Sequence, residues 1–167
     1  MDLAIRPVDP FDSTALTLLR EAAIEARQIY ADRIDANAPW PTNTPLPARG
    51  IYLVAYFFGE PAGCGSLYPL DETTAEIRRM FVVPRSRRSG IAQKMLDALE
   101  AAAVDFGYLT LRLETGIRQP AAMRLYEKAG FERIAKFGAH GSDPLSVCYE
   151  KRVAVGGVAA HAKRTTT

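Results

Sequence analysis

The spacing of apolar residues changes at Pro84, and this change limits the possible folds more than any other feature of the sequence. Before Pro84, three short runs rich in β-branched and aromatic residues cover 51–58, 62–68 and 75–83, with turn-forming residues between them. After it, apolar residues recur at helical spacing over 91–106. The pattern predicts three antiparallel strands joined by short turns, followed by a helix that crosses over to a new strand.

Weaker patterns on both sides complete the predicted order of elements. The expected elements are a strand near 3–8, a helix from Asp12 or Ser13 to Tyr30, a strand over 108–113, a helix over 120–129, and strands over 131–137 and 145–152. The whole order is β-α-β-β-β-α-β-α-β-β, an α/β (α+β) fold with a mixed, mostly antiparallel sheet flanked by helices. We expect one domain over 1–152 and a flexible tail over 153–167, where small residues and threonines leave little to pack.

Composition excludes several classes of protein. The chain is 48% apolar and 24% charged, which argues against disorder, and its formal charge of +2 is too small to attract nucleic acid over the whole surface. No apolar stretch is long enough to cross a membrane and no signal sequence is visible, so a cytoplasmic protein is expected. Two cysteines and two histidines form neither a disulfide scaffold nor a closely spaced four-ligand zinc site. We expect no metal, and core positions for Cys64 and Cys148.

Two loops interrupt these elements. Residues 37–47 contain four prolines, which exclude regular structure there. Trp40 in this loop is either a plug at the edge of the core or part of a lid over a ligand, and the pattern leaves both open. Residues 138–144 contain His140, for which a solvent-exposed position in a loop is the favoured interpretation.

The junction between the third strand and the following helix carries the strongest chemical signal. Ser89, Gly90 and Ala92 are small enough for a ligand to approach the backbone, and the first turn of the helix offers unpaired N–H groups. Residues 77–96 contain six basic residues and no acidic one. These features predict an anion site for phosphate, with a solvated arginine face as the alternative. A Walker loop and a dinucleotide fingerprint are excluded, because the Gly-Lys-Ser/Thr and the leading glycines of those motifs are absent.

Two motifs make the sequence resemble the GNAT acyltransferase superfamily. The acyl-CoA loop of the superfamily, Q/R-x-x-G-x-G/A, is similar to residues 87–92, Arg-Arg-Ser-Gly-Ile-Ala. The later motif, Asn-x-x-Ala-x-x-Leu-Tyr-x-x-x-Gly-Phe, is matched at Ala122, Leu125, Tyr126, Gly130 and Phe131, with Gln119 in place of the usual Asn. The resemblance covers residues 3–152 and implies a single acyl-CoA N-acyltransferase domain.

The resemblance implies acetyl-CoA as the cosubstrate. Pantetheine would pair with the backbone of the third strand near Met80, Phe81, Val82 and Val83, as an added strand does. The pyrophosphate would lie on the backbone N–H groups of Arg87, Arg88, Ser89, Gly90, Ile91 and Ala92. Gln119 would stand where the Asn of the family contacts the cofactor or a nearby backbone group.

The resemblance also implies catalytic roles, because a protonated amine must lose a proton before it attacks a thioester. Tyr126 would protonate the leaving thiolate; otherwise it is a half-buried aromatic residue of the motif helix. Glu76 is the first candidate for the base and Glu114 the second. Glu76 is equally compatible with a strand-edge position beside a neighbouring arginine.

We therefore expect an N-acetyltransferase that moves acetyl from acetyl-CoA to a primary amine of a small molecule by direct attack. Segments 20–50 and 138–146 would shape the acceptor site. The alternatives are a protein N-terminal or lysine acetyltransferase, a non-catalytic CoA-binding module and, last, nucleic-acid binding through the arginines. We expect an amine substrate as partner, with no nucleic acid and no membrane, and leave open a homodimer through an edge strand.

Overall fold

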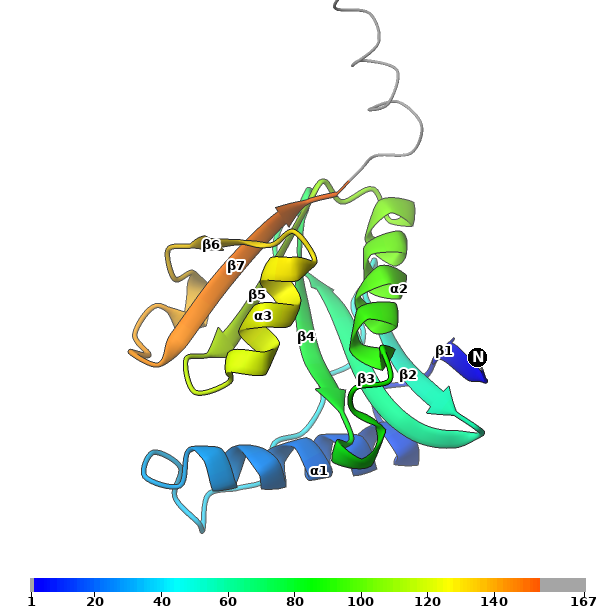
Figure 1. Ribbon diagram of the computed structural model, residues 1–167. Helices are drawn as coiled ribbons and strands as arrows, with labels where there is room; N and C mark the ends of the chain where they lie inside the picture. Colours follow the sequence, from blue (N-terminus) through cyan, green and yellow to red (C-terminus); the bar gives the residue numbers. More distant parts are fainter. Residues whose placement is uncertain (1, 154–167) are drawn as a thin grey trace, which may run out of the picture.

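A seven-stranded sheet forms the centre of this computed structural model, which describes residues 2–153 (Figure 1). The strands are β1 (Leu3–Pro7), β2 (Ile51–Phe57), β3 (Glu60–Pro69), β4 (Thr74–Val82), β5 (Thr110–Gly116), β6 (Glu132–Ile134) and β7 (Ser146–Arg152). They lie in the order β1-β2-β3-β4-β5-β7-β6, and all neighbours are antiparallel except β4 and β5. The predicted mixed, mostly antiparallel sheet is confirmed.

Helices cover both faces of this sheet. They are α1 (Ser13–Ile29), α2 (Ile91–Asp105) and α3 (Pro120–Lys128), with short 3-10 turns η1 (Pro84–Ser86) and η2 (Gly138–His140). On β3, Gly65 faces Met95 and Leu99 of α2, whereas its neighbour Cys64 lines a recess together with Leu19 of α1. Because successive residues of a strand point to opposite faces, α1 and α2 pack on opposite sides. In Figure 1, α2 and α3 stand in front of the sheet and α1 crosses below the ends of β3 and β4.

The helix α1 begins directly after Asp12, one of the two predicted capping residues. The Asp12 carboxylate accepts a hydrogen bond from the Thr14 N–H at 2.9 Å, which is the geometry of a helix N-cap. Ala15 and Leu18 are buried against the sheet, whereas Leu16 is 38% exposed. The helix therefore turns Ala15 and Leu18, and not Leu16, toward the sheet.

Two strands begin or end at other residues than the pattern predicts. The strand expected over 108–113 begins at Thr110, because the Tyr108 N–H still donates to the Ala103 carbonyl at the end of α2. The strand expected over 131–137 is reduced to β6, whose three residues pair with the edge of β7.

One residue of the predicted tail, Val153, lies within the described residues. Val153 is 7% exposed, and its N–H donates to the Leu109 carbonyl at 3.0 Å, so it belongs to the packed domain. The rest of the predicted tail, 154–167, lies outside the described residues. Among residues 2–153, no helix is both long and apolar enough to cross a membrane.

Candidate active site

The sheet opens between its two parallel strands. β4 and β5 pair from Thr74 to Ile77 on one side and from Thr110 to Leu113 on the other, and then diverge. Beyond this point β4 pairs only with β3, and β5 pairs only with β7. Arg79 has a φ of 60°, in the left-handed region, at the irregularity of the β3–β4 ladder. Such an extra residue bends a strand, so the irregularity and the divergence occur together.

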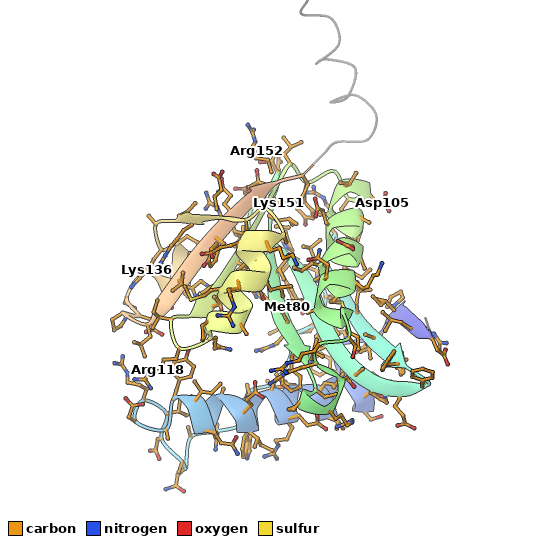
Figure 2. All side chains as sticks on the ribbon, in the orientation of Figure 1. Met80, Asp105, Arg118, Lys136, Lys151 and Arg152 are labelled. Atoms are coloured by element: carbon orange, nitrogen blue, oxygen red, sulfur yellow. The ribbon has the colours of Figure 1, made fainter. Side chains whose placement is uncertain are left out.

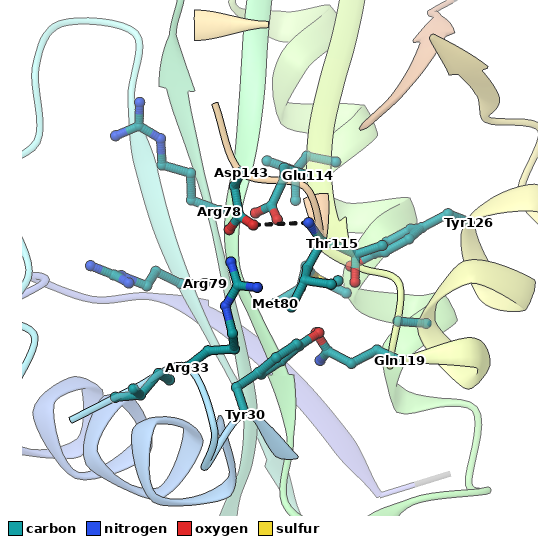
Figure 3. A pocket seen from close by; sticks show the side chains of 15 residues that line it. Tyr30, Arg33, Arg78, Arg79, Met80, Glu114, Thr115, Gln119, Tyr126 and Asp143 are labelled. Atoms are coloured by element: carbon teal, nitrogen blue, oxygen red, sulfur yellow. Dashed lines mark hydrogen bonds between the residues drawn. The ribbon is translucent and has the colours of Figure 1, made fainter. Parts of the chain in front are cut away.

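The divergence creates a cavity of about 470 Å³ (Figure 3). Its walls come from the end of α1, from β4 and β5, from the start of α3 and from the loop before β7. Figure 2 shows Met80 at the opening between α2 and α3. The polar or charged side chains of the lining are Tyr30, Arg33, Arg78, Arg79, Glu114, Thr115, Gln119, Tyr126 and Asp143.

The far half of β4 has a free edge along this cavity. The Val83 N–H donates to the Ala62 carbonyl of β3 at 2.9 Å. Backbone groups alternate between the two edges of a strand, so those of Val82 face the side that β5 has left. The Val82 carbonyl accepts a hydrogen bond from Nε of Arg87 at 2.9 Å. Phe81 and Val82 are half-buried and Val83 is fully buried, which places all three predicted residues on this strand end.

The turn between η1 and α2 presents a row of backbone N–H groups. Within the described residues, the N–H groups of residues 88–93 have no hydrogen-bond acceptor, because α2 begins at Ile91. Gly90, the N-cap, has a φ of 79°, and Arg88 has a φ of 63°. The Ile91 side chain is buried and so anchors the first turn of the helix. Arg88, Ser89, Gly90, Ile91 and Ala92 thus have the geometry expected of an anion site, and their role stays a prediction.

Arg87 has a different environment from the one predicted. Its N–H donates to the Pro84 carbonyl at 3.3 Å, so it is the one backbone donor of the proposed loop with an internal acceptor. Its guanidinium pairs with both carboxylate oxygens of Glu25 on α1, at 2.8 and 2.9 Å. Arg87 therefore ties α1 to the end of β4, a contact between distant segments that a local motif does not reveal.

The end of α1 is clasped to the start of α3 across one side of the cavity. The Tyr30 hydroxyl lies 3.3 Å from Oε1 of Gln119, which is the residue that replaces the Asn of the motif. Next to it, Arg118 forms two hydrogen bonds with the Asp32 carboxylate, at 2.5 and 2.9 Å. Arg118 is labelled beside the end of α1 in Figure 2. We call these two residue pairs the clasp. Gln119 is thus bonded within the protein, and cofactor binding by it stays a prediction.

Tyr126 enters the cavity from α3. Its ring packs against Phe131 and Tyr149, with ring centroids 5.9 and 6.1 Å away. Figure 3 shows its hydroxyl pointing into the cavity, near Thr115. Burial raises the pKa of this phenol, and the nearby Glu114 carboxylate raises the pKa further. Tyr126 is therefore protonated throughout the neutral range and is able to donate a proton or a hydrogen bond.

Glu76 is buried beneath the cavity and does not line it. Its side chain is 5% exposed, and one carboxylate oxygen accepts a hydrogen bond from Nε of Arg78. The other oxygen lies 2.9 Å from Nε2 of His140. The predicted pairing of Glu76 with a neighbouring arginine is thus present. The interpretation of His140 as a solvent-exposed loop residue is wrong, because η2 turns this side chain inward onto Glu76.

Glu114 is the carboxylate that lines the cavity. It lies at the point where β5 leaves β4, and Oε1 accepts a hydrogen bond from the Ser146 hydroxyl at 3.1 Å. Burial raises its pKa above the ordinary value, while His140 and the Ser146 hydrogen bond act in the opposite direction. A carboxylate with a raised pKa is a stronger base than an exposed one. Of the two predicted candidates for the base, Glu114 is the one in the cavity wall.

Trp40 occupies neither of the two expected positions. Its ring lies 3.9 Å from the guanidinium carbon of Arg20 and 3.6 Å from that of Arg27, and 41% of the residue is exposed. Arg27 also donates hydrogen bonds to the carbonyls of Ala36 and Ala38 in the same loop. The tryptophan therefore fastens the proline-rich loop to α1. It is not in the lining of the main cavity, and it does not fill the core.

Comparisons with known proteins agree with this architecture. A family model for the acetyltransferase (GNAT) family matches residues 15–131, more than half of the chain. An IAA acetyltransferase of Azospirillum brasilense is 39% identical over 101 residues, which are 60% of this chain and 66% of that protein. The chain thus spans just under two thirds of this curated relative.

Solved structures extend the likeness to nearly the whole chain. A Klebsiella pneumoniae protein to which acyl-CoA N-acyltransferase activity is ascribed is 34% identical, with a TM-score of 0.74 over 91% of this chain and 98% of that one. A GNAT acetyltransferase from Elizabethkingia anophelis with acetyl-CoA bound has a TM-score of 0.65 at 19% identity, over 91% and 99% of the two chains. This second likeness shows a common fold.

The sheet opens between its two parallel strands, and an unpaired helix N-terminus lies beside the opening. Together with the likeness to the Klebsiella protein, these features define an acyltransferase domain. More narrowly, the chain belongs to the acetyltransferase (GNAT) family. The family uses acetyl-CoA, and the class of protein predicted from the two motifs is confirmed.

Proposed function

We propose that this protein is an N-acetyltransferase that transfers the acetyl group of acetyl-CoA directly to a primary amine of a small molecule. One observation carries the proposal. Glu114, which is able to accept a proton, and Tyr126, which is able to donate one, line the same cavity. That cavity lies where the free edge of β4 leads to the unpaired N-terminus of α2.

The residues around the opening fit acetyl-CoA. Five consecutive residues from Arg88 to Ala92 offer N–H groups without internal acceptors, as a pyrophosphate requires. The edge of β4 that β5 has left offers the Val82 N–H to an extended amide-containing chain, while Arg87 occupies the Val82 carbonyl. When bound, acetyl-CoA supplies an acetyl group activated as a thioester. Arg88 is exposed beside this turn and adds positive charge.

The protein supplies the proton transfers. We assign the base to Glu114, because it lines the cavity and its pKa is raised by burial. It takes the proton that the amine must lose as its nitrogen forms a bond with the acetyl carbon. Tyr126 donates a proton to the sulfur as the carbon–sulfur bond breaks. Glu76 is engaged by Arg78 and His140, so we assign it a supporting position instead of direct contact with the amine.

The clasp favours a small acceptor over a protein N-terminus or a lysine side chain. Tyr30 with Gln119, and Asp32 with Arg118, bridge α1 and α3 on one side of the cavity. A peptide that lies across an active site needs a groove open at both ends, whereas this bridge closes one side. The cavity of about 470 Å³ is within the range typical of small-molecule sites.

A CoA-release assay over a panel of amines, with isothermal titration of acetyl-CoA in parallel, tests the proposal. We expect turnover with at least one amine and a loss of about 10²–10⁴-fold in kcat/KM for Glu114→Gln. Tyr126→Phe should lower kcat while acetyl-CoA binding persists. Glu132→Gln and Tyr56→Phe, which lie outside the cavity lining, are the matched controls. Tight acetyl-CoA binding without turnover on any amine or peptide would instead favour the non-catalytic module.

A further inference from the structure

His140 joins the two carboxylates between which the sequence could not decide. Its Nε2 lies 2.9 Å from Oε2 of Glu76, and its Nδ1 lies 3.7 Å from Oε2 of Glu114. The first distance is that of a hydrogen bond and the second that of an ion pair. The imidazole side chain is 28% exposed, and the Glu76 side chain is 5% exposed. A loop between β6 and β7 thus places one ring between a buried carboxylate and a carboxylate of the cavity wall.

The charge state of the ring decides what this bridge does. A neutral imidazole has one N–H and is able to donate to one carboxylate only, whereas an imidazolium donates from both nitrogens. Glu76 already accepts a hydrogen bond from Arg78, whereas within residues 2–153 Glu114 accepts one only from the uncharged Ser146 hydroxyl. An imidazolium therefore gives Glu114 the only positive charge within ion-pair distance among the described residues.

The other groups around His140 do not replace it. On the same loop, the Asp143 carboxylate accepts the Leu145 N–H, and Lys136 donates to the Asp143 backbone carbonyl. Phe137 packs edge-on against the His140 ring, with centroids 5.3 Å apart. On β5, the Arg112 guanidinium lies over the Phe137 ring and forms an ion pair with Glu150. On β7, Cys148 is a buried, uncharged thiol.

We propose that His140 is a positioning residue of the active site: its ring links buried Glu76 to Glu114 and holds the Glu114 carboxylate in place at the cavity wall. Glu76 then acts on the reaction through His140 and not by touching the amine. The role of Glu114 as base rests on the proposed function. The link between the three side chains does not, so the two are tested separately.

The link is tested without any substrate by nitrogen NMR of the histidine ring. The sequence has two histidines, His140 and His161, so His161→Gln leaves one ring to observe. Glu114→Gln and Glu76→Gln should each change the chemical shifts of the ring nitrogens, because each alters a group within 3.7 Å of one of these nitrogens. Glu132→Gln, an exposed carboxylate on β6, is the control. Ring-nitrogen shifts that both substitutions leave unchanged overturn the proposal.

Kinetics then test the positioning role. His140→Gln keeps a hydrogen-bonding side chain but removes the imidazole, which acts to lower the pKa of Glu114. The acid limb of the kcat/KM profile should move to higher pH, with about a tenfold loss on that limb and a smaller loss at alkaline pH. In a Glu114→Gln background the same substitution should have no further effect. A uniform loss at every pH, or an undiminished effect in that background, shows a merely structural role. If NMR finds the link and no amine is turned over, the proposed function fails and the link stands.

Discussion

The Tyr30 hydroxyl fills the space where a side chain on Gly116 would begin. A β-carbon built on Gly116 would lie 1.6 Å from the Tyr30 hydroxyl oxygen and 2.9 Å from Oε1 of Gln119. The Tyr30–Gln119 half of the clasp therefore exists only because residue 116 has no side chain. The last residue of β5 thus determines how α1 closes over the cavity.

We predict that Gly116→Ala breaks this contact. The methyl group has to displace the Tyr30 ring, and we expect a loss of about 1–3 kcal/mol in the free energy of unfolding. Urea denaturation measures the loss. Gly141→Ala is the matched control, since its φ is −61° and its added carbon would meet nothing closer than 3.4 Å. If Gly116→Ala and Gly141→Ala are equally stable, Tyr30 does not occupy this space in solution.

Gly90→Glu should abolish most of the acetyl-CoA binding. The substitution places a negative charge and a side chain at the unpaired N-terminus of α2, and we expect Kd to rise by roughly tenfold or more. Isothermal titration gives the Kd. Gly59→Glu controls for backbone strain, because Gly59 has the same φ of 79° and likewise no atom within 4 Å of an added carbon. Equal Kd values for the two variants would contradict the assignment of the anion site.

Glu114→Gln should make the protein more stable at neutral pH. The pKa of Glu114 is raised in the folded state, mainly by burial, so the folded chain binds this proton more tightly than the unfolded chain does. The stability of the parent therefore falls as pH rises from the unfolded pKa, about 4.3, to the higher folded one. Urea denaturation at pH ~7 should show a gain for Glu114→Gln that disappears at pH ~4. A loss at neutral pH would mean that the Ser146 and His140 contacts outweigh burial.

Neither cysteine should react in the folded protein. Cys64 is 2% exposed, and burial raises the pKa of its thiol to about 11. Only about a thousandth of such a thiol is ionised near pH 8, and Cys148 is buried as well. A chromogenic disulfide reagent should therefore label neither thiol until urea unfolds the chain. Ser142→Cys, on an exposed loop, is the positive control and should react at once. Rapid labelling of the parent would contradict the core positions.

The sequence predicted most of the fold because most of its signals are local. Pro120 at the first turn of α3, Gly90 before α2 and the strand runs before Pro84 each act within a few residues, and each element is present. The two motifs predicted the family for the same reason. Element limits were less accurate where a distant partner decides them, as at Tyr108, which is still bonded to the end of α2.

The parts of the site that could not be predicted depend on contacts between distant segments. His140 and Glu76 are separated by 64 positions, and no spacing rule brings them together. Arg87 was assigned to phosphate from its place in the motif, but its guanidinium binds Glu25, 62 positions away. The choice between Glu76 and Glu114 was open for a related reason. It depends on where β5 leaves β4, close to the β3–β4 irregularity at Arg79.

The divergence of β4 and β5 also bears on how the protein avoids unwanted association. An unpaired strand edge normally recruits other strands and promotes aggregation, and proteins tend to keep such edges short or covered. Here the edge lies in the interior of a seven-stranded sheet, between a helix on one side and the clasp on the other. A strand from another molecule would have to pass between these flanking elements before it could pair with the edge. The fold therefore keeps a backbone hydrogen-bonding group available for a ligand without exposing a strand edge at which copies of the protein could associate.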